Sequence, residues 1–175
     1  MQQLKFPYKR VLIIGNGGAG KSTLAVKISE KFKLPAVHLD RLWWLEGWRN
    51  RSEEQFDELL DKQLEKSEWV IDGNYRRTFS HRLEYADFCI FLDYPAKLCL
   101  ESVYARAELY RGRTRPDMAD GCEERVDGEF ECWVNEFEEK VRPVMLFELE
   151  RSSVPYKIFG SREQTAAWLD GFENN

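Results

Sequence analysis

The chain places a glycine, four residues, a second glycine, a lysine and a serine at Gly15-Asn16-Gly17-Gly18-Ala19-Gly20-Lys21-Ser22, with Thr23 next. This spacing is the P-loop pattern, whose glycines let backbone N–H groups surround a phosphate. Residues 10–14 before it form a short apolar run with β-branched side chains, which predicts a buried strand. Residues 23–33 after it carry apolar side chains at helical spacing, which predicts an amphipathic helix. A glycine loop between a strand and a helix N-terminus predicts a nucleoside triphosphate site.

The P-loop pattern also predicts a role for each part of the loop. Backbone amides at the positive end of the helix dipole are expected to bind the phosphates of ATP. Lys21 is expected to neutralise charge on the β- and γ-phosphates during catalysis, and the Ser22 hydroxyl to bind Mg²⁺. The predicted ATP-binding residues are Gly15, Asn16, Gly17, Gly18, Ala19, Gly20, Lys21, Ser22 and Thr23.

The composition of the 175-residue chain is that of an ordinary globular protein, with 43% hydrophobic and 33% charged residues. The formal net charge of -5 argues against a surface that follows a nucleic-acid backbone, so we expect no direct nucleic-acid binding. No apolar run approaches the ~20 residues of a membrane span, and residues 1–7 lack the apolar segment of a signal peptide. We therefore expect a cytoplasmic protein without membrane attachment. The four cysteines lack paired CxxC spacing, which argues against a zinc site.

Strand and helix patterns alternate along the chain. The predicted strands are residues 10–14, 36–40, 69–73, 88–92 and 156–160, and a kink or break between helices is expected at Pro143. We expect residues 1–175 to form a single three-layer α/β domain, with a five-stranded parallel sheet and helices on both faces. Ligands of such sheets bind at the carboxyl ends of the strands.

Two acidic residues end predicted strands at this edge. Phosphoryl transfer needs an acid that holds Mg²⁺ or its waters, and often an acid that orients the acceptor hydroxyl. Asp72 is the candidate for the metal, and Asp40 is the candidate that binds or activates the acceptor. A solvated strand end or a helix cap is the alternative for both. Asp93 also ends a strand, but Pro95 follows closely and favours a capping role for it.

Two arginines follow Asp72. Residues 72–78, Asp-Gly-Asn-Tyr-Arg-Arg-Thr, resemble the Asp-Gly-aromatic-Pro-Arg stretch of adenylate kinase-like nucleoside monophosphate kinases. The resemblance implies that an arginine holds an anion of the phosphate acceptor, here Arg76 or Arg77. The chain has one extra residue and no proline at this point, so the choice between the two stays open. A surface turn with solvated arginines is the alternative.

Arg111, Arg113 and Arg115 lie within five positions between two predicted helices. Guanidinium groups this close repel one another without an anion, and they can stabilise charge on a transferred phosphoryl group. We therefore expect residues 111–125 to form a lid with three catalytic arginines, open and mobile until a triphosphate binds. The Arg115-Pro116 pair resembles the lid of shikimate kinase-like enzymes. A mobile charged loop is the alternative.

Three tryptophans, Trp43, Trp44 and Trp48, follow Asp40. Aromatic rings in this region can stack a base or another flat acceptor, which makes Trp44 a candidate acceptor-binding residue. The alternative is that the rings pack an irregular loop onto the helix predicted at residues 52–66.

Residues 70–75, 91–93 and 111–125 together resemble the DNA topology modulation proteins, a family of adenylate kinase-like P-loop proteins. The longest matching stretch reads Arg-Gly-Arg-Thr-Arg-Pro-Asp-Met-Ala-Asp-Gly-Cys over residues 111–122, and Glu124-Arg125 follow it. The resemblance implies a kinase-like fold with strand order 2-3-1-4-5 and ATP as ligand. It leaves the substrate open.

The motifs together predict an ATP-dependent phosphotransferase, a kinase acting on a small molecule or a nucleotide, with Ser22 and Asp72 as metal residues. The alternative is a non-enzymatic switch, in which ATP orders the lid for a protein or DNA partner.

Overall fold

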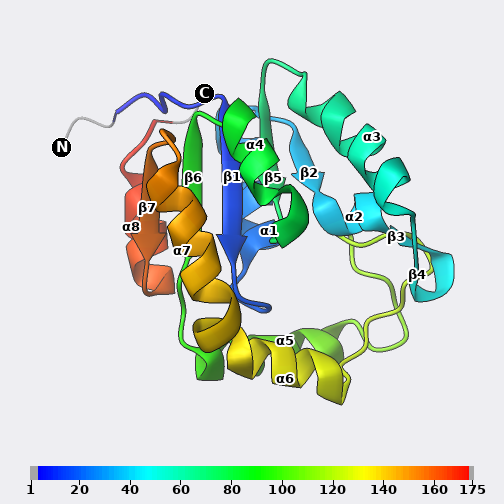
Figure 1. The fold of residues 1–175 in the computed structure, drawn as a ribbon. Helices are drawn as coiled ribbons and strands as arrows, with labels where there is room; N and C mark the ends of the chain where they lie inside the picture. Colours follow the sequence, from blue (N-terminus) through cyan, green and yellow to red (C-terminus); the bar gives the residue numbers. More distant parts are fainter. Residues whose placement is uncertain (1–3, 174–175) are drawn as a thin grey trace.

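The computed structural model describes residues 4–173 and contains a five-stranded parallel sheet with helices on both faces (Figure 1). The strand order is β2-β5-β1-β6-β7, which is 2-3-1-4-5 when these five strands are counted along the chain. The strands are β1 (Arg10–Gly15), β2 (Ala36–His38), β5 (Trp69–Asp72), β6 (Phe88–Leu92) and β7 (Tyr156–Phe159). The predicted three-layer α/β fold is therefore confirmed.

Two groups of helices cover the two faces of the sheet. Successive side chains of a strand point to opposite faces, so Val11 and Ile13 pack with α1 and α8, whereas Leu12 and Ile14 pack with α3, α4 and α7. These helices are α1 (Lys21–Phe32), α3 (Glu53–Leu64), α4 (Phe79–Tyr85), α7 (Arg142–Arg151) and α8 (Arg162–Asp170). Local signals start two of them, because Ser52 and Ser161 each accept a hydrogen bond from a backbone N–H three residues later.

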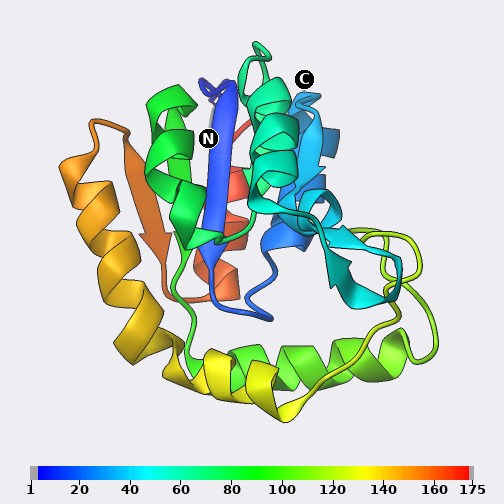
Figure 2. The same cartoon turned by 45° about the vertical axis from the view of Figure 1, so that its right-hand side comes forward.

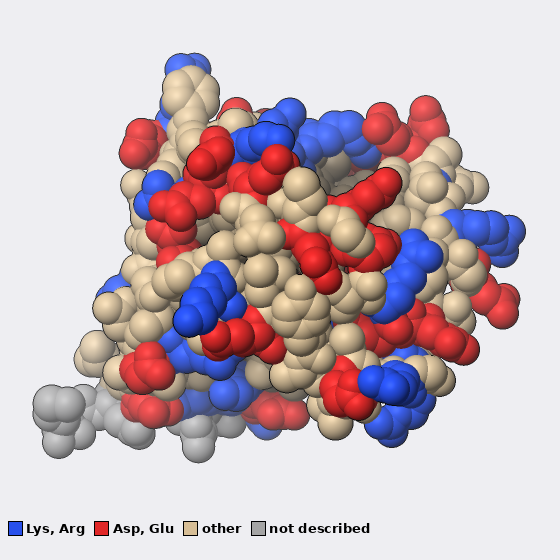
Figure 3. Space-filling model, turned by 90° about the horizontal axis from the view of Figure 1, so that it is seen from below, with Lys and Arg blue, Asp and Glu red and all other residues tan. Residues whose placement is uncertain are grey.

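Helices α5 (Ala96–Leu109) and α6 (Gly128–Glu136) lie across the carboxyl ends of the strands instead of along a face of the sheet (Figures 1 and 2). The backbone of α5 approaches the P-loop closely, and a Cβ atom added at Gly18 would lie 2.2 Å from the Cys99 carbonyl oxygen. Gly18 also has a φ of 81°, in the left-handed region, so the fold requires glycine there. Figure 3 shows acidic and basic side chains interspersed on the face that α5 and α6 form.

A short antiparallel hairpin, β3 (Trp44–Leu45) and β4 (Arg49–Asn50), stands beside the main sheet. The segment of residues 110–127 connects α5 to α6 and contacts this hairpin, since the Gly47 N–H donates to the Gly121 carbonyl. Two segments that lie far apart in the sequence therefore lie side by side (Figure 2).

The break between helices that was predicted at Pro143 is confirmed, because a new helix, α7, begins at Arg142 with Pro143 in its first turn, after a π-helical turn at Phe137–Val141. Two local predictions are wrong. Asp40 does not end a strand, because β2 stops at His38 and Asp40 lies in the first turn of α2 (Leu39–Trp43). Asp93 does not cap α5, whose N-cap residue is Pro95 and makes no side-chain hydrogen bond.

None of the helices within residues 4–173 combines the length and the apolar character that a membrane crossing requires. Residues 1–3, part of the segment weighed above as a signal peptide, lie outside the described residues.

Candidate active site

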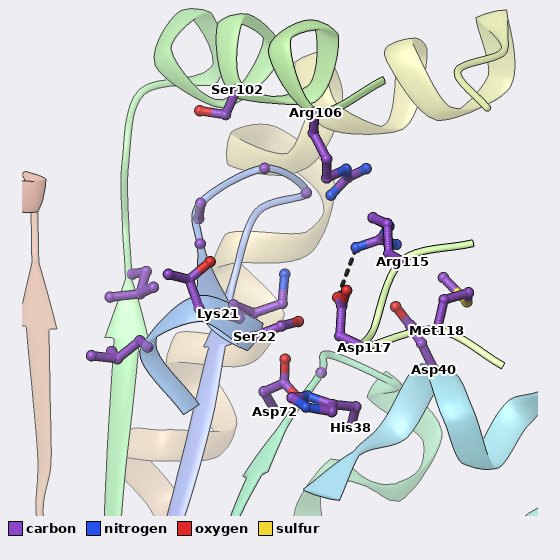
Figure 4. A pocket seen from close by; sticks show the side chains of 18 of the residues that line it. Lys21, Ser22, His38, Asp40, Asp72, Ser102, Arg106, Arg115, Asp117 and Met118 are labelled. Carbon is purple, nitrogen blue, oxygen red and sulfur yellow. Dashed lines mark hydrogen bonds and ion pairs between the residues drawn. The ribbon is translucent and has the colours of Figure 1, made fainter. Parts of the chain in front are cut away.

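A cavity of about 1540 Å³ lies between the carboxyl ends of the strands, α5 and the hairpin. Figure 4 shows Lys21, Ser22 and Asp72 on one side of it and Asp40 and Arg115 across from them. The cavity is lined by these predicted site residues: Gly17, Gly18, Ala19, Gly20, Lys21, Ser22, Thr23, Asp40, Trp44, Asp72 and Arg115. It is not lined by Gly15, Asn16, Arg76, Arg77, Arg111 or Arg113.

Hydrogen bonds from two asparagine side chains hold the backbone of the P-loop in place. The Asn74 side chain accepts from the Gly15 N–H at 3.0 Å and donates to the Gly15 carbonyl at 2.7 Å. The buried Asn16 side chain donates to the Val134 carbonyl of α6 at 2.8 Å and accepts from the Gly17 N–H. Gly15 and Asn16 therefore support the loop, and the loop residues that line the cavity are those after them.

Lys21 begins α1, and its Nζ atom donates to the carbonyl oxygens of Gly15 at 3.0 Å and Asn16 at 2.9 Å. Burial lowers the pKa of Lys21, and the charges of Asp72 and Asp40 oppose that shift. An anionic ligand in the cavity would add to the negative charge of these two carboxylates, and would so further stabilise the charged form of the Lys21 ammonium group.

Asp72 forms a pair with His38 that the sequence patterns did not reveal. The two residues are neighbours in the register of β5 and β2, and Asp72 Oδ1 lies 2.7 Å from His38 Nδ1. Burial lowers the pKa of His38, but the hydrogen bond and charge of Asp72 outweigh it, so that the pKa is raised overall. His38 thereby fixes one carboxylate oxygen of Asp72 at the edge of the cavity.

Asp40 accepts a hydrogen bond of 2.7 Å from the Tyr75 hydroxyl at its Oδ1 atom. Burial raises the pKa of Asp40, and the charge of Asp72 adds to this shift. Burial and the charge of Asp40 also raise the pKa of Tyr75, so the phenol stays a proton donor. The two carboxylates therefore lie in different environments, with Asp72 beside the His38 imidazole and Asp40 beside the Tyr75 hydroxyl.

Arg82 holds the loop that carries Asn74 and Tyr75. Its fully buried guanidinium donates to the carbonyls of Gly73 at 2.9 Å and Tyr75 at 3.2 Å, and also to the Asn74 carbonyl. Burial lowers the pKa of Arg82 to about 10. The loop needs this support, because Tyr75 has a φ of 33°, which is strained for a residue with a side chain.

Of the three predicted lid arginines, only Arg115 faces the cavity. Its guanidinium lies 2.7 Å from Asp117 and 2.5 Å from Glu124, whose second oxygen lies 2.8 Å from Arg106 of α5. Arg106 reaches down from α5 toward Arg115 in Figure 4. Burial and the neighbouring charge of Arg115 lower the pKa of Arg106. A second arginine thus lines the cavity, from a helix instead of the arginine-rich stretch.

The other two arginines of the stretch point elsewhere. Arg111 pairs with Glu108, and Arg113 donates to the Leu109 carbonyl and lies over the Tyr110 ring. The three guanidinium groups do not face each other, because each has a separate protein partner. The premise of mutual repulsion was therefore wrong.

The stretch is docked on the tryptophan hairpin instead of standing open. The Trp48 Nε1–H donates to the Glu123 carbonyl at 3.0 Å, and the Arg125 guanidinium lies 4.9 Å from the Trp48 ring. The buried Cys122 thiol contacts the Leu45 carbonyl at 3.1 Å. These contacts close one side of the cavity.

The arginines after Asp72 lie outside the cavity. Arg77 forms a two-pronged ion pair with Asp57 of α3, at 2.6 and 2.9 Å, and Arg76 is exposed. Asp93 is also outside, where it accepts two hydrogen bonds of 2.9 Å from Arg142 of α7. In this structure the predicted arginine grip on an acceptor anion is not formed by either residue.

Residues 4–173 contain no cluster of three His, Cys, Asp or Glu side chains that would enclose a metal ion. Mg²⁺ does not require one, because it commonly binds through one or two protein ligands together with phosphates and waters. The Ser22 hydroxyl and the Asp72 carboxylate line the same cavity beside the P-loop, so their oxygens fit this pattern.

Comparisons with known proteins agree with the fold. No family model matches the chain. The uncharacterized protein YqaC of Bacillus subtilis (strain 168) is 31% identical over 102 residues, 56% of either chain, so the match spans about half of that relative. The shikimate kinase from Acinetobacter baumannii matches with a TM-score of 0.57 at 16% identity, over 93% of this chain and 90% of its own. The shikimate kinase from Bacteroides thetaiotaomicron matches with a TM-score of 0.54 at 19% identity, over 93% of this chain and 95% of its own. A deoxyadenosine kinase from M. mycoides matches with a TM-score of 0.53 at 15% identity, over 92% of this chain and 99% of its own.

The chain therefore has the fold of P-loop kinases. The resemblance to the DNA topology modulation proteins stays a prediction.

Proposed function

We propose that the protein is an ATP-dependent phosphotransferase that transfers the γ-phosphoryl group to a hydroxyl group of a small molecule. The observation that carries this proposal is the shared cavity, because the P-loop with Lys21 and the carboxylates of Asp40 and Asp72 face the same space. A protein that only binds Mg·ATP can use the P-loop, Lys21 and Asp72, but it has no use for a second carboxylate such as Asp40.

On the donor side, the amides of residues 17–23 and the Lys21 ammonium bind the triphosphate. The Ser22 hydroxyl and Asp72 hold Mg²⁺, which when bound neutralises charge on the phosphate oxygens. Asp72 is pre-oriented for this role by its hydrogen bond to His38.

On the acceptor side, Asp40 receives the hydroxyl proton. The acceptor oxygen forms a bond to the γ-phosphorus, the bond from that phosphorus to the β–γ bridging oxygen breaks, and ADP leaves with the bond electrons. The raised pKa of Asp40 brings this carboxylate closer to the range in which a general base works at neutral pH.

Arg115 and Arg106 lie across the cavity from Lys21, and we propose that they bind the oxygens of the transferred group. Residues 111–125 then act as a lid that carries one catalytic arginine instead of three. Binding in a site closed by this lid would exclude water from the γ-phosphate.

The test is a screen with purified protein, Mg·ATP and hydroxyl-bearing small molecules, in which mass spectrometry detects phosphorylated products. Product that depends on Mg²⁺ and is abolished by a chelator supports the proposal. ATP binding without any phosphorylated acceptor would favour the regulatory switch.

A further inference from the structure

The wall of the cavity beside α2 and the end of β5 carries two carboxylates, Asp40 and Asp72. Tyr75 donates to one oxygen of Asp40 and His38 contacts one oxygen of Asp72, so each carboxylate keeps a second oxygen. A phosphate monoester carries close to two negative charges at neutral pH and would be repelled at this wall. A neutral hydroxyl group would instead donate a hydrogen bond to it.

The cations near this wall already have partners. Arg115 is 9% exposed and pairs with both Asp117 and Glu124. Arg125 lies at the rim, where it is held over the Trp48 ring and 58% of its side chain is exposed. Arg115 and Arg106 are assigned above to the transferred phosphoryl group and Arg125 lies at the solvent boundary, so none of these three is left for a phosphate group on the acceptor.

Arg76 and Arg77 are the arginines that the resemblance to nucleoside monophosphate kinases assigned to an acceptor anion. Neither lines the cavity, and the charge of Arg77 is matched by Asp57 of α3. In this structure neither of these two arginines is therefore placed to bind a phosphate group on the acceptor.

The remaining surface of this wall is aromatic. Trp43, Trp44 and Trp48 are half-buried and line the cavity. Trp43 packs against Phe56 and Tyr75, and Trp48 is covered by Arg125. Trp44, which contacts the other two tryptophans edge-on, is the ring on which the flat face of a ligand could pack.

We propose that the acceptor is an uncharged compound with hydroxyl groups and a flat or apolar face, such as a nucleoside or a sugar, and is not a phosphate monoester. A hydroxyl group of the acceptor binds Asp40, and its flat face packs on Trp44, while Asp72 keeps its role on the side of the metal. This inference rests on the proposed phosphotransferase activity, because it names the acceptor of that reaction.

The test uses acceptors in pairs that differ only by a phosphate group: adenosine and AMP, thymidine and dTMP, glucose and glucose 6-phosphate. Transfer from Mg·ATP to each compound is measured, and binding of each is measured by calorimetry with a non-hydrolysable ATP analogue present. In at least one pair, we expect the neutral member to exceed its phosphorylated partner by about 100-fold or more in kcat/KM and in affinity. If a nucleoside pair shows this difference, the acceptor is a nucleoside, and if the glucose pair shows it, the acceptor is a sugar.

One substitution and three controls test whether the carboxylate wall causes this preference for neutral acceptors. Asp40→Asn retains an oxygen that accepts from the Tyr75 hydroxyl, but it removes one negative charge. The affinity for the neutral member of a pair, divided by the affinity for its phosphorylated partner, should therefore fall by about tenfold. Asp57→Asn removes a carboxylate outside the cavity and should leave this ratio unchanged. Arg76→Ala and Arg77→Ala should also leave it unchanged.

Preference for the phosphorylated members, binding of neither member in every pair, or loss of preference in Arg76→Ala or Arg77→Ala would overturn the inference. Transfer to a phosphorylated acceptor would overturn it while leaving the phosphotransferase in place. Binding of neutral compounds without any transfer would instead refute the phosphotransferase and leave the acceptor assignment standing.

Discussion

Replacing Arg115 with alanine tests whether this arginine has the catalytic role proposed for it, as distinct from the other arginines of the same segment. Arg115 is 9% exposed and bonds Asp117 and Glu124 in the wall of the cavity, whereas Arg113 is exposed and bonds a backbone carbonyl. The two arginines lie two positions apart. Arg113→Ala is therefore a matched control for the loss of one positive charge from the same segment.

The magnitude follows from the ion pairs. Breaking a buried pair costs about 3–5 kcal/mol, and we expect about 2–4 kcal/mol here because Glu124 keeps Arg106 and the cavity admits water. For a chain of this length such a loss lowers Tm by about 10 °C. Turnover should fall by about 100-fold, which corresponds to about 2.7 kcal/mol of transition-state stabilisation, with a smaller change in ATP affinity.

The assays are thermal unfolding followed by circular dichroism, calorimetric titration with ATP, and phosphate transfer at a temperature where both variants are folded. Arg115→Lys, which keeps the charge and loses the planar fork, should recover only part of the activity. Equal losses in Arg113→Ala and Arg115→Ala, or normal turnover in Arg115→Ala, would refute the assignment of a single catalytic arginine to this segment.

Three other substitutions test the remaining parts of the site, and a fourth, Asp93→Asn, is a control outside it. Asp72→Asn should reduce Mg²⁺-dependent turnover by about 100-fold. Asp93→Asn should have little effect on turnover, because Asp93 pairs with Arg142 outside the cavity. Equal effects of the two substitutions in a titration with Mg²⁺ would show that Asp72 is not the metal residue. Trp44→Ala should weaken acceptor binding by about tenfold with unchanged ATP affinity, as measured by calorimetry, if the ring stacks on the acceptor. Asp40→Asn should abolish transfer yet raise the free energy of unfolding at neutral pH. The folded-state pKa of Asp40 lies above its ordinary value, so the wild type loses stability as the pH rises through that pKa and the variant does not. Urea unfolding at several pH values should show the advantage of the variant shrinking toward acid pH, and a constant difference would contradict this reasoning.

Local sequence signals were sufficient for the parts of the fold that depend on short spacings. The P-loop, its strand and its helix were predicted because the glycine spacing and the flanking apolar residues are contiguous. The helix predicted at residues 52–66 is also present, as α3, and a capping box at Ser52 and Gln55 begins it with two hydrogen bonds that span three residues.

Contacts between distant residues were not predicted. Asp93 was interpreted as a helix cap because Arg142, its partner, lies 49 residues away in the sequence. The pair of His38 and Asp72 depends on the register of β2 and β5, which no local pattern shows. Arg106 was missed because it resembles an ordinary helix residue until α5 is placed across the sheet.

Side-chain direction was the other source of error. The three arginines of residues 111–115 share a composition signal, but the turn between them directs only Arg115 into the cavity. Asp40 lines the cavity as predicted, although it lies in a helix and not in the predicted strand, because α2 begins directly after β2 ends. Residue type and position in the chain thus predicted which residues lie near the cavity better than they predicted where each side chain points.

The most direct test of the proposed phosphotransferase follows the γ-phosphoryl group of labelled ATP in the wild type and in Lys21→Ala. Lys21 is the cation that lines the cavity from the P-loop, and it lies in the field of both candidate carboxylates. We predict that the wild type transfers the label to an acceptor in the presence of Mg²⁺, and that Lys21→Ala transfers it at least about 100 times more slowly while keeping its fold. Label found only in ATP or in free phosphate with the wild type, or equal transfer by the two proteins, would contradict the account.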